Sequence, residues 1–306
     1  MKDKILLAVK GFCMGGADVV PGVSGGTMAF ILGIYADLIA AIKSFDSTWL
    51  LAVLRLDFKT AISRPHFAFL IPLGCGLFCA LMFFTRVIHL PVLLIEYPEQ
   101  IYGLFFGLIA GSIVVLLMGM SELKLREGLM ILPGLLLGFL VFNLVPTQTP
   151  DAAWFIFLAG ALSICAMILP GISGSFILLM LNKYAYIFNA IGYFKFSILI
   201  PFGLGAITGL LVFSRVLSYL LNHYYRQTIL FISGLLIASL YVIWPFQERV
   251  YETVREKQRL MSSTPVWPHD FSEAVLVSFA LLVCGLLFVL MISKVSGRKQ
   301  FNKGQA

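Results

Sequence analysis

Two short turns rich in glycine and serine are the residues of this chain best suited to chemistry. The segment PGVSGGTMAFILGIY at residues 21–35 returns as PGISGSFILLMLNKY at residues 170–184. A Pro-Gly turn breaks a helix and leaves backbone N–H groups without helical partners. Small side chains let a ligand approach those groups, and the helix that follows points its positive dipole end at the same place. Such a turn is suited to binding an anion.

The predicted binding site combines these turns with two arginines: Ser24, Gly25, Gly26, Thr27, Ser173, Gly174, Ser175, Arg86 and Arg215. Each arginine is either a forked donor to a phosphate oxygen or a side chain that snorkels to the membrane surface. Asp18, a carboxylate within an apolar segment, either caps the first turn or takes a coupling proton. No cluster of histidine, cysteine and carboxylate has the spacing of metal ligands, so we predict no metal and no cofactor.

The turns belong to a longer duplication. Residues 21–42 and 170–191 share nine of 22 positions at a constant offset of 149, and residues 67–88 and 196–217 share ten of 22. The second pair of segments matches Pro72 with Pro201, Gly74 with Gly203, Gly76 with Gly205 and Arg86 with Arg215. Matched proline, glycine and arginine positions argue against a chance likeness of apolar segments. We therefore predict two repeats, residues 1–149 and 150–306.

The composition predicts an integral membrane protein. Hydrophobic residues make up 60% of the chain and charged residues 12%, which is more apolar surface than one soluble core could bury. Apolar runs long enough, or nearly so, to span about 30 Å of hydrocarbon lie at residues 67–88, 101–120, 129–145, 196–217, 229–245 and 274–293. The net charge of +7 lies mostly in loops beside these runs, where it orients the chain. No nucleic-acid motif accompanies it.

Each repeat is predicted to be a re-entrant helical hairpin followed by three transmembrane helices, in an all-α fold. The hairpins cover about residues 5–42 and 153–191. An odd number of crossings inverts the second repeat, so the two turns would meet near the membrane midplane. With a cytoplasmic amino terminus, 14 Lys and Arg residues face the cytoplasm and six the other side, as the positive-inside rule requires. We expect both termini in the cytoplasm and an amino terminus that is retained, because its apolar run is too short for a signal peptide.

The sequence also predicts the structure of two segments outside the spans and the environment of several tyrosines and cysteines. Residues 47–63 mix apolar and charged side chains and predict a helix lying on the cytoplasmic surface, with a plain linker as the alternative. The polar residues 247–270 predict an extracytoplasmic loop. Tyr35 and Tyr184 are expected to pack or to lie at the interface. The cysteines are expected to be buried small hydrophobes: Cys13, Cys75, Cys79, Cys165 and Cys284.

The motif GADVVPGVSGGT with the following GIY, together with PGISGS, resembles the bacterial polyprenyl-phosphate (undecaprenyl-phosphate) transporter family, formerly a membrane domain of unknown function. The resemblance covers essentially the whole chain. It implies a flippase of the bacterial inner membrane that returns undecaprenyl phosphate from the outer to the inner leaflet, recycling the lipid carrier of peptidoglycan and other envelope glycans. The implied partners are this lipid and the bilayer, and a coupling ion, proton or sodium, stays open. Asn182 and Lys183 depart from the pattern where glycine is expected.

Three other functions are compatible with parts of this sequence. A channel or carrier for a small anion would use the same backbone donors. The turn is also similar to the PGxSRS turn of membrane undecaprenyl-pyrophosphate phosphatases, but Gly25 and Gly174 stand where those enzymes need arginine. The glutamates fall in predicted loops: Glu96, Glu99, Glu122 and Glu127. A membrane scaffold is the last alternative. We predict a transporter rather than an enzyme, one that exposes a midplane phosphate site alternately to each side.

Overall fold

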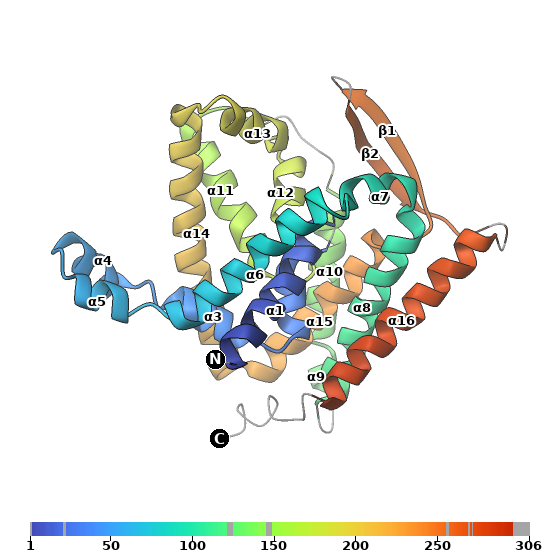
Figure 1. Cartoon of the computed structure of the whole chain (residues 1–306), viewed down its shortest axis with the longest axis horizontal. Helices are drawn as coiled ribbons and strands as arrows, with labels where there is room; N and C mark the ends of the chain where they lie inside the picture. Colours follow the sequence, from blue (N-terminus) through green and yellow to red (C-terminus); the bar gives the residue numbers. More distant parts are fainter. Residues whose placement is uncertain are drawn as a thin grey trace.

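The structure, a computed structural model, describes residues 2–20, 23–120, 125–144, 149–254, 257–268, 270 and 272–295. Figure 1 shows that these residues form a body of helices with one β-hairpin at its edge. The helices of the first half are α1 (Lys2–Asp18), α2 (Gly25–Ile31), α3 (Tyr35–Lys43), α4 (Ser47–Leu54), α5 (Phe58–Ser63), α6 (Phe67–Arg86), α7 (Leu90–Glu96), α8 (Pro98–Met118), α9 (Leu125–Gly128) and α10 (Ile131–Phe142). The second half contains α11 (Ala153–Ile168), α12 (Gly174–Met180), α13 (Tyr184–Gly192), α14 (Phe196–His223), α15 (Tyr225–Val242), β1 (Gln247–Val254), β2 (Lys257–Pro265) and α16 (Glu273–Val295).

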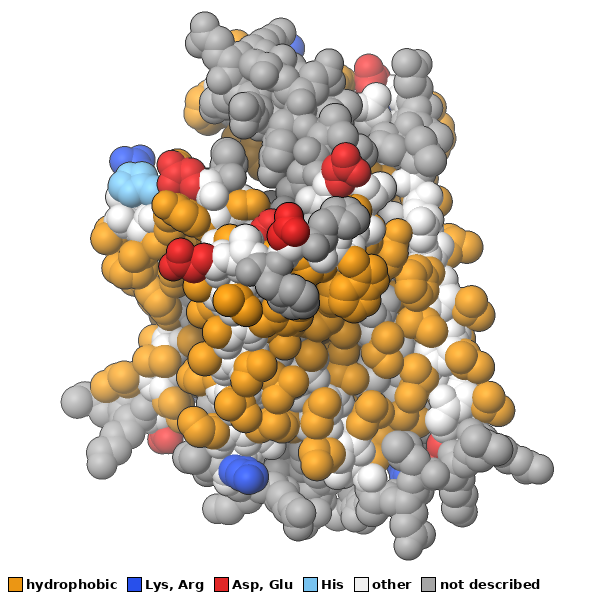
Figure 2. All heavy atoms as spheres, turned by 90° about the vertical axis from the view of Figure 1, so that its right-hand side faces the viewer, with side chains coloured by type: hydrophobic (Ala, Val, Ile, Leu, Met, Phe, Trp, Pro, Cys, Tyr) orange, Lys and Arg blue, Asp and Glu red, His pale blue; other side chains and the backbone are white. Residues whose placement is uncertain are grey.

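Helices α6, α8, α14, α15 and α16 are long and apolar enough to cross a bilayer. They fall on five of the predicted spans. The remaining one, residues 129–145, contains only the 12-residue α10, which at about 1.5 Å per residue is shorter than the hydrocarbon core. Hydrophobic side chains gather in a band across the face shown in Figure 2, with acidic side chains along its upper edge. The fold is therefore that of a multi-pass membrane protein.

The two halves pack in matching pairs of helices. Helix α1 packs along α6, and α11 packs in the same way along α14. The remaining long helices pair across the halves, α8 with α16 and α10 with α15. A large cluster of buried apolar residues is shared by both halves, with Met28 and Ile39 from the first and Ile232 and Leu236 from the second. The larger of the two buried clusters therefore joins the two halves, and a smaller one, at Ala166, Ile172 and Leu235, lies in the second half.

The fold is mostly helical, as predicted, but the prediction of a loop at residues 247–270 is wrong at residues 247–265. Instead of a loop, β1 and β2 form an antiparallel hairpin, with Gln247 opposite Pro265 and Val254 opposite Lys257. The register shifts between Val250 and Tyr251. Each strand pairs only with the other in the part of the chain that the structure describes. The hairpin extends from the body beside α7 (Figure 1).

The predicted surface helix at residues 47–63 is instead two short helices. Leu56 adopts a positive φ of 57° between α4 and α5, so the chain turns back on itself. Both helices keep the amphipathic composition: Leu54, Phe58 and Ile62 are 70%, 69% and 67% exposed, beside charged neighbours. Figure 1 shows the α4–α5 pair projecting sideways from the body, at the level of the amino terminus.

The expectation of buried cysteines is wrong for three of them. Cys75, Cys79 and Cys284 are exposed on their helices, and Cys13 and Cys165 are only partly buried. An apolar environment outside the protein explains the pattern, because a small thiol tolerates lipid as well as a protein core. No group of three potential metal ligands occurs among the described residues.

Candidate functional site

The first turn separates α1 from α2 and is held by side chains of its own segment. Ser24 is the N-cap of α2, and its Oγ accepts the N–H of Gly26 at 3.1 Å. One carboxylate oxygen of Asp18 accepts the N–H of Gly25 at 2.6 Å. A capping oxygen of this kind satisfies donors that the helix itself leaves unpaired. Asp18 is thus placed as a cap of the turn; Pro21 and Gly22 lie outside the described residues.

The second turn, between α11 and α12, is built alike but is more open. Its N-cap residue, Ser173, has the same extended backbone as Ser24 (φ −101° against −121°) but makes no capping bond. The hydroxyls of Ser173 and Ser175 instead lie 2.6 Å apart and bond to each other. Ser175 is exposed and Ser173 half-buried, whereas Gly174 is buried. The second turn therefore presents hydroxyl groups that a ligand can reach.

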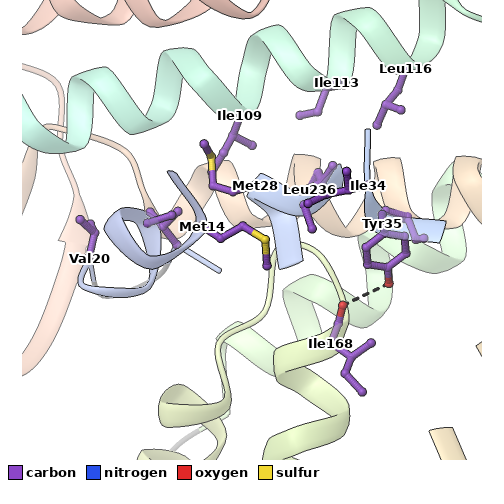
Figure 3. Packing of buried hydrophobic residues seen from close by; sticks show 14 of the residues in the cluster. Met14, Val20, Met28, Ile34, Tyr35, Ile109, Ile113, Leu116, Ile168 and Leu236 are labelled. Atoms are coloured by element: carbon purple, nitrogen blue, oxygen red, sulfur yellow. Dashed lines mark hydrogen bonds between the residues drawn. The ribbon is translucent and has the colours of Figure 1, made fainter. Parts of the chain in front are cut away.

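The two turns touch each other, as predicted. Thr27 Oγ1 accepts the N–H of Gly171 at 2.9 Å. In the opposite direction, Ser24 Oγ donates to the carbonyl oxygen of Met167 at 3.3 Å. The hydroxyl of Tyr35 donates to the carbonyl oxygen of Ile168 at 3.1 Å, the dashed contact in Figure 3. These bonds join segments more than 130 residues apart in the chain.

Several donors expected to bind an anion are paired within the protein in this arrangement. The N–H groups of Gly25, Gly26 and Gly171 all bond to side-chain oxygens. Ser24 and Thr27 are only 3% and 1% exposed. An anion could use the N–H of Gly171 only after the contact between the turns had opened, and the N–H groups of Gly25 and Gly26 only by displacing the oxygens of Asp18 and Ser24. The site is therefore a closed junction with accessible hydroxyls on one side.

The ends of α2 and α12 also correspond, and this resolves the departure at Asn182. Gly33 and Asn182 follow the two helices with φ of 66° and 53°, and asparagine tolerates this left-handed conformation better than most residues. The carbonyl oxygens of Leu32 and Leu181 each accept an outside donor, from Lys10 Nζ at 2.9 Å and Thr149 Oγ1 at 2.5 Å. Asparagine thus replaces glycine without changing the path of the chain.

Lys183 is buried and paired, which the sequence did not indicate. Its side chain is 4% exposed and its Nζ bonds to the carboxylate of Asp151 and, at 2.8 Å, to the carbonyl oxygen of Thr149. The rings of Phe155 and Tyr186 lie within 6 Å of the ammonium group, at 5.8 and 5.4 Å. A buried ammonium group needs such partners. Lys183 therefore ties α13 to the start of α11, away from the turns.

The two arginines lie apart from the turns and from each other. Arg86 is the last residue of α6 and is exposed. Arg215, on α14, donates from Nη1 to the carbonyl oxygen of Leu211 at 2.8 Å and from Nη2 to that of Phe45 at 3.5 Å. Among the described residues, neither arginine forms a hydrogen bond or ion pair with a residue of the junction. Arg86 is a cation at the end of α6, and Arg215 is a cation on the side of α14.

Comparison with known proteins identifies the family of the chain. The profile of the undecaprenyl phosphate translocase-like family matches residues 14–261, a range that includes both turns. The chain belongs to this family. A polyprenyl-phosphate transporter of Vibrio cholerae is 40% identical over 241 residues, 78% of this chain and 77% of the relative. A polyprenyl-phosphate transporter of Staphylococcus aureus is 32% identical over 259 residues, 78% of this chain and 85% of the relative. No solved structure matches.

Sequence reasoning placed the turn residues together but missed their partners. Tyr35 was expected to pack or to lie at the interface, yet its hydroxyl joins the start of α3 to the end of α11. Its position in the duplication was the available signal. No sequence signal marked the carbonyl oxygens of Met167 and Ile168, because every residue carries a carbonyl oxygen.

Asp18 allows a test that separates its two predicted roles. Asp18→Asn keeps an oxygen that can accept the Gly25 N–H, so we expect transport to stay within about threefold of the wild type. Asp18→Ala leaves that N–H without an acceptor, which costs about 1–3 kcal/mol, and should lower transport about tenfold. Both variants are compared at equal amounts of folded protein. A folded but inactive Asp18→Asn protein would instead identify Asp18 as a proton carrier.

Proposed function

We propose that this protein is a flippase that moves polyprenyl phosphate, such as undecaprenyl phosphate, from the outer to the inner leaflet of the bacterial inner membrane. The observation that carries the proposal is the family match across both turns. The names of the two relatives, both polyprenyl-phosphate transporters, support this substrate. They also favour transport over catalysis. The transfer would return the lipid carrier to the side on which it is reloaded.

The proposed architecture is a pair of inverted repeats, each opening with a re-entrant hairpin. Helices α2 and α12 begin at Gly25 and Gly174, and α3 and α13 at Tyr35 and Tyr184, all at the offset of 149 found in the sequence. In Figure 1, α6 rises from the level of the amino terminus while its counterpart α14 descends toward that level. This supports opposite directions for the two halves. Both termini would then lie in the cytoplasm.

The proposed substrate site is the junction between the turns. Ser173 and Ser175 would make the first contact with the phosphate, because their hydroxyls are accessible. Opening of the junction would then free the N–H of Gly171, and the phosphate would displace the oxygens of Asp18 and Ser24 from the N–H groups of Gly25 and Gly26, at the start of α2. Arg86 and Arg215 would serve as cations near opposite faces of the membrane. Alternating exposure of the site follows the mechanism of other inverted-repeat transporters.

The decisive experiment measures how much polyprenyl phosphate is exposed on the outer surface of cells with and without this protein. The cells should lack other polyprenyl-phosphate transporters, so that depletion is not compensated. We expect exposed carrier to accumulate on depletion. Unchanged exposure would contradict the flippase. Vesicles containing the purified protein test the small-anion carrier: rapid phosphate or chloride flux that polyprenyl phosphate does not inhibit would favour that function instead.

A further inference from the structure

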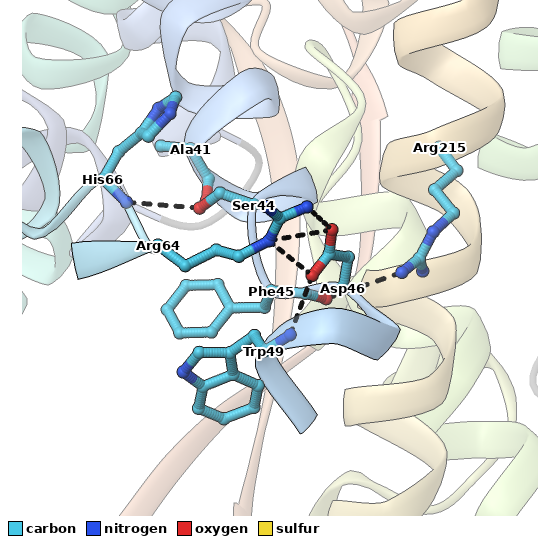
Figure 4. A network of polar contacts seen from close by, with 8 residues as sticks. All are labelled: Ala41, Ser44, Phe45, Asp46, Trp49, Arg64, His66 and Arg215. Atoms are coloured by element: carbon cyan, nitrogen blue, oxygen red, sulfur yellow. Dashed lines mark hydrogen bonds and ion pairs between the residues drawn. The ribbon is translucent and has the colours of Figure 1, made fainter. Parts of the chain in front are cut away.

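A polar pocket lies at the base of the α4–α5 pair, away from the junction of the turns. Its volume is about 500 Å³, and its lining residues are Ser44, Asp46, Thr60, Ser63, Arg64 and His66. Figure 4 shows Asp46 between the guanidinium groups of Arg64 and Arg215. The α4–α5 pair lies toward the end of the body that carries the amino terminus (Figure 1), the face proposed to be cytoplasmic.

The donors around Asp46 form a set that suits a phosphate. Arg64 donates from Nε at 3.0 Å and from Nη2 to the two carboxylate oxygens, a forked arrangement. The N–H of Trp49 donates to the same carboxylate at 2.9 Å. Arginine binds carboxylate and phosphate with the same two-pronged geometry. The Asp46 carboxylate therefore occupies a place that a phosphate group could take.

The ion pair with Arg64, and not burial, holds the Asp46 carboxylate in the pocket. The hydrogen bond from Arg64 keeps the pKa of Asp46 well below its usual range, so this carboxylate stays ionised throughout physiological pH. Protonation would not release Arg64. Another anion could, because the pair is exposed to solvent: the Arg64 and Asp46 side chains are 43% and 27% exposed, and exposed ion pairs are weak.

Exposed apolar side chains lie near the pocket on two helical elements, which favours a lipid over a free ion. Leu54 and Phe58, on the α4–α5 pair, are 70% and 69% exposed. On α14, Val212 and Val216 flank Arg215 and are 56% and 49% exposed. A charged pocket between lipid-facing surfaces matches an amphiphile, with its head group in the pocket and its chain along the apolar side chains.

We propose that this pocket binds the phosphate head group of a polyprenyl phosphate in the inner leaflet, with Arg64 and Arg215 as its cations and Asp46 as a built-in competitor. The inference rests on the proposed function and adds a second site, where the lipid leaves the protein. Phosphate would displace the Asp46 carboxylate from Arg64. The return of Asp46 would then promote release of the lipid.

The test is binding of labelled farnesyl phosphate to the full-length protein in detergent, with farnesol and inorganic phosphate as competitors. Loss of the Arg64 fork in Arg64→Gln should weaken binding about tenfold or more. Asp46→Asn removes the competing charge and should strengthen binding several-fold. Lys59→Gln removes a cation of the same α4–α5 pair that does not line the pocket, and should leave affinity unchanged. We expect unlabelled farnesyl phosphate to compete much better than either farnesol or inorganic phosphate.

The direction of the Asp46→Asn effect decides the outcome. If the Asp46–Arg64 pair only fastens the α4–α5 pair to the body, both variants loosen it and both weaken binding, which would overturn the proposal. Loss of folding cannot mimic a gain in affinity. Equal competition by inorganic phosphate would show an anion site without a lipid preference and would also overturn the proposal.

A further comparison separates this proposal from the proposed function. Suppose that the wild-type protein binds farnesyl phosphate and lowers the surface exposure of polyprenyl phosphate in cells. If Arg64→Gln then binds farnesyl phosphate as tightly as the wild type, the pocket proposal is wrong and the flippase proposal stands. If the wild-type protein neither binds farnesyl phosphate nor lowers the surface exposure of polyprenyl phosphate, both proposals are wrong.

Discussion

Replacing Gly205 by valine is expected to prevent α11 and α14 from packing and so to remove most folded protein from the membrane. A Cβ atom on Gly205 would lie 1.9 Å from the carbonyl oxygen of Phe157, on α11. That oxygen belongs to helical backbone, so only a shift of the whole helix could make room. Overpacking usually costs about 1–3 kcal/mol, and we expect this substitution to reach or exceed the upper value. The measurement is the amount of folded protein after gentle detergent extraction, followed by its thermal stability.

The chain supplies its own control for this prediction. Gly203 lies two residues earlier on α14, and a Cβ there would meet nothing within 4 Å. Gly203→Val should therefore leave the amount of folded protein close to that of the wild type. The first half repeats the comparison: a Cβ on Gly76 would lie 1.9 Å from the carbonyl oxygen of Ala8, whereas one on Gly74 meets nothing. Equal effects of valine at Gly203 and Gly205 would contradict the close approach of α11 and α14.

The parts of the fold that depend on composition and repetition were predictable. Long apolar runs identify membrane-spanning helices without tertiary information, and the repeated Pro-Gly turns mark where α1 and α11 end. The length of α10 was overestimated, because the apolar run at residues 129–145 continues beyond the end of the helix at Phe142. Hydropathy reports solubility in lipid and does not locate the last helical hydrogen bond.

The β-hairpin was missed because polar composition was taken to mean a loop. Val250, Tyr251, Thr253 and Val254 in β1 are residue types that favour strands, and this signal was present in the sequence. The pairing of the two strands is local, so it needs no contact with the apolar body. Charge and polarity placed the segment outside the bilayer but gave no secondary structure.

The polar side chains of the site could be predicted from the sequence, but the closed contact between the two turns could not. The sequence indicated that Ser24 and Thr27 would face the second turn, since hydroxyl groups recur at a break in an apolar segment. It could not indicate that the turns bond to each other, because the partners are the backbone N–H of Gly171 and the carbonyl oxygens of α11. The Asp46–Arg64 pair joins residues 18 positions apart, beyond any helical or strand period.

Thr27→Val should lower transport about tenfold while leaving the protein folded, because it breaks the hydrogen bond from the N–H of Gly171, in the second turn, to the first turn. Valine has nearly the shape of threonine, so packing at this position, which is 1% exposed, is kept. The buried N–H of Gly171 loses its acceptor, 2.9 Å away in the wild type, at a cost of about 1–3 kcal/mol. A cost of about 1.4 kcal/mol changes an equilibrium tenfold, so the closed junction would lose occupancy relative to the open one.

The same substitution elsewhere separates this effect from a general loss of a buried hydroxyl. Thr228, on α15, is also buried, at 7% exposed, but its hydroxyl donates to the carbonyl oxygen of Tyr224 within its own helix, at 2.8 Å. Thr228→Val leaves no N–H unpaired, and we expect transport close to that of the wild type. Transport is measured as outer-surface exposure of polyprenyl phosphate, normalised to the amount of folded protein. If Thr27→Val behaved like Thr228→Val, the contact between the turns would have no part in transport. If Thr27→Val is selectively impaired, the contact between the turns is required for transport, since valine at Thr27 alters no charge and leaves the exposed hydroxyls of the second turn in place.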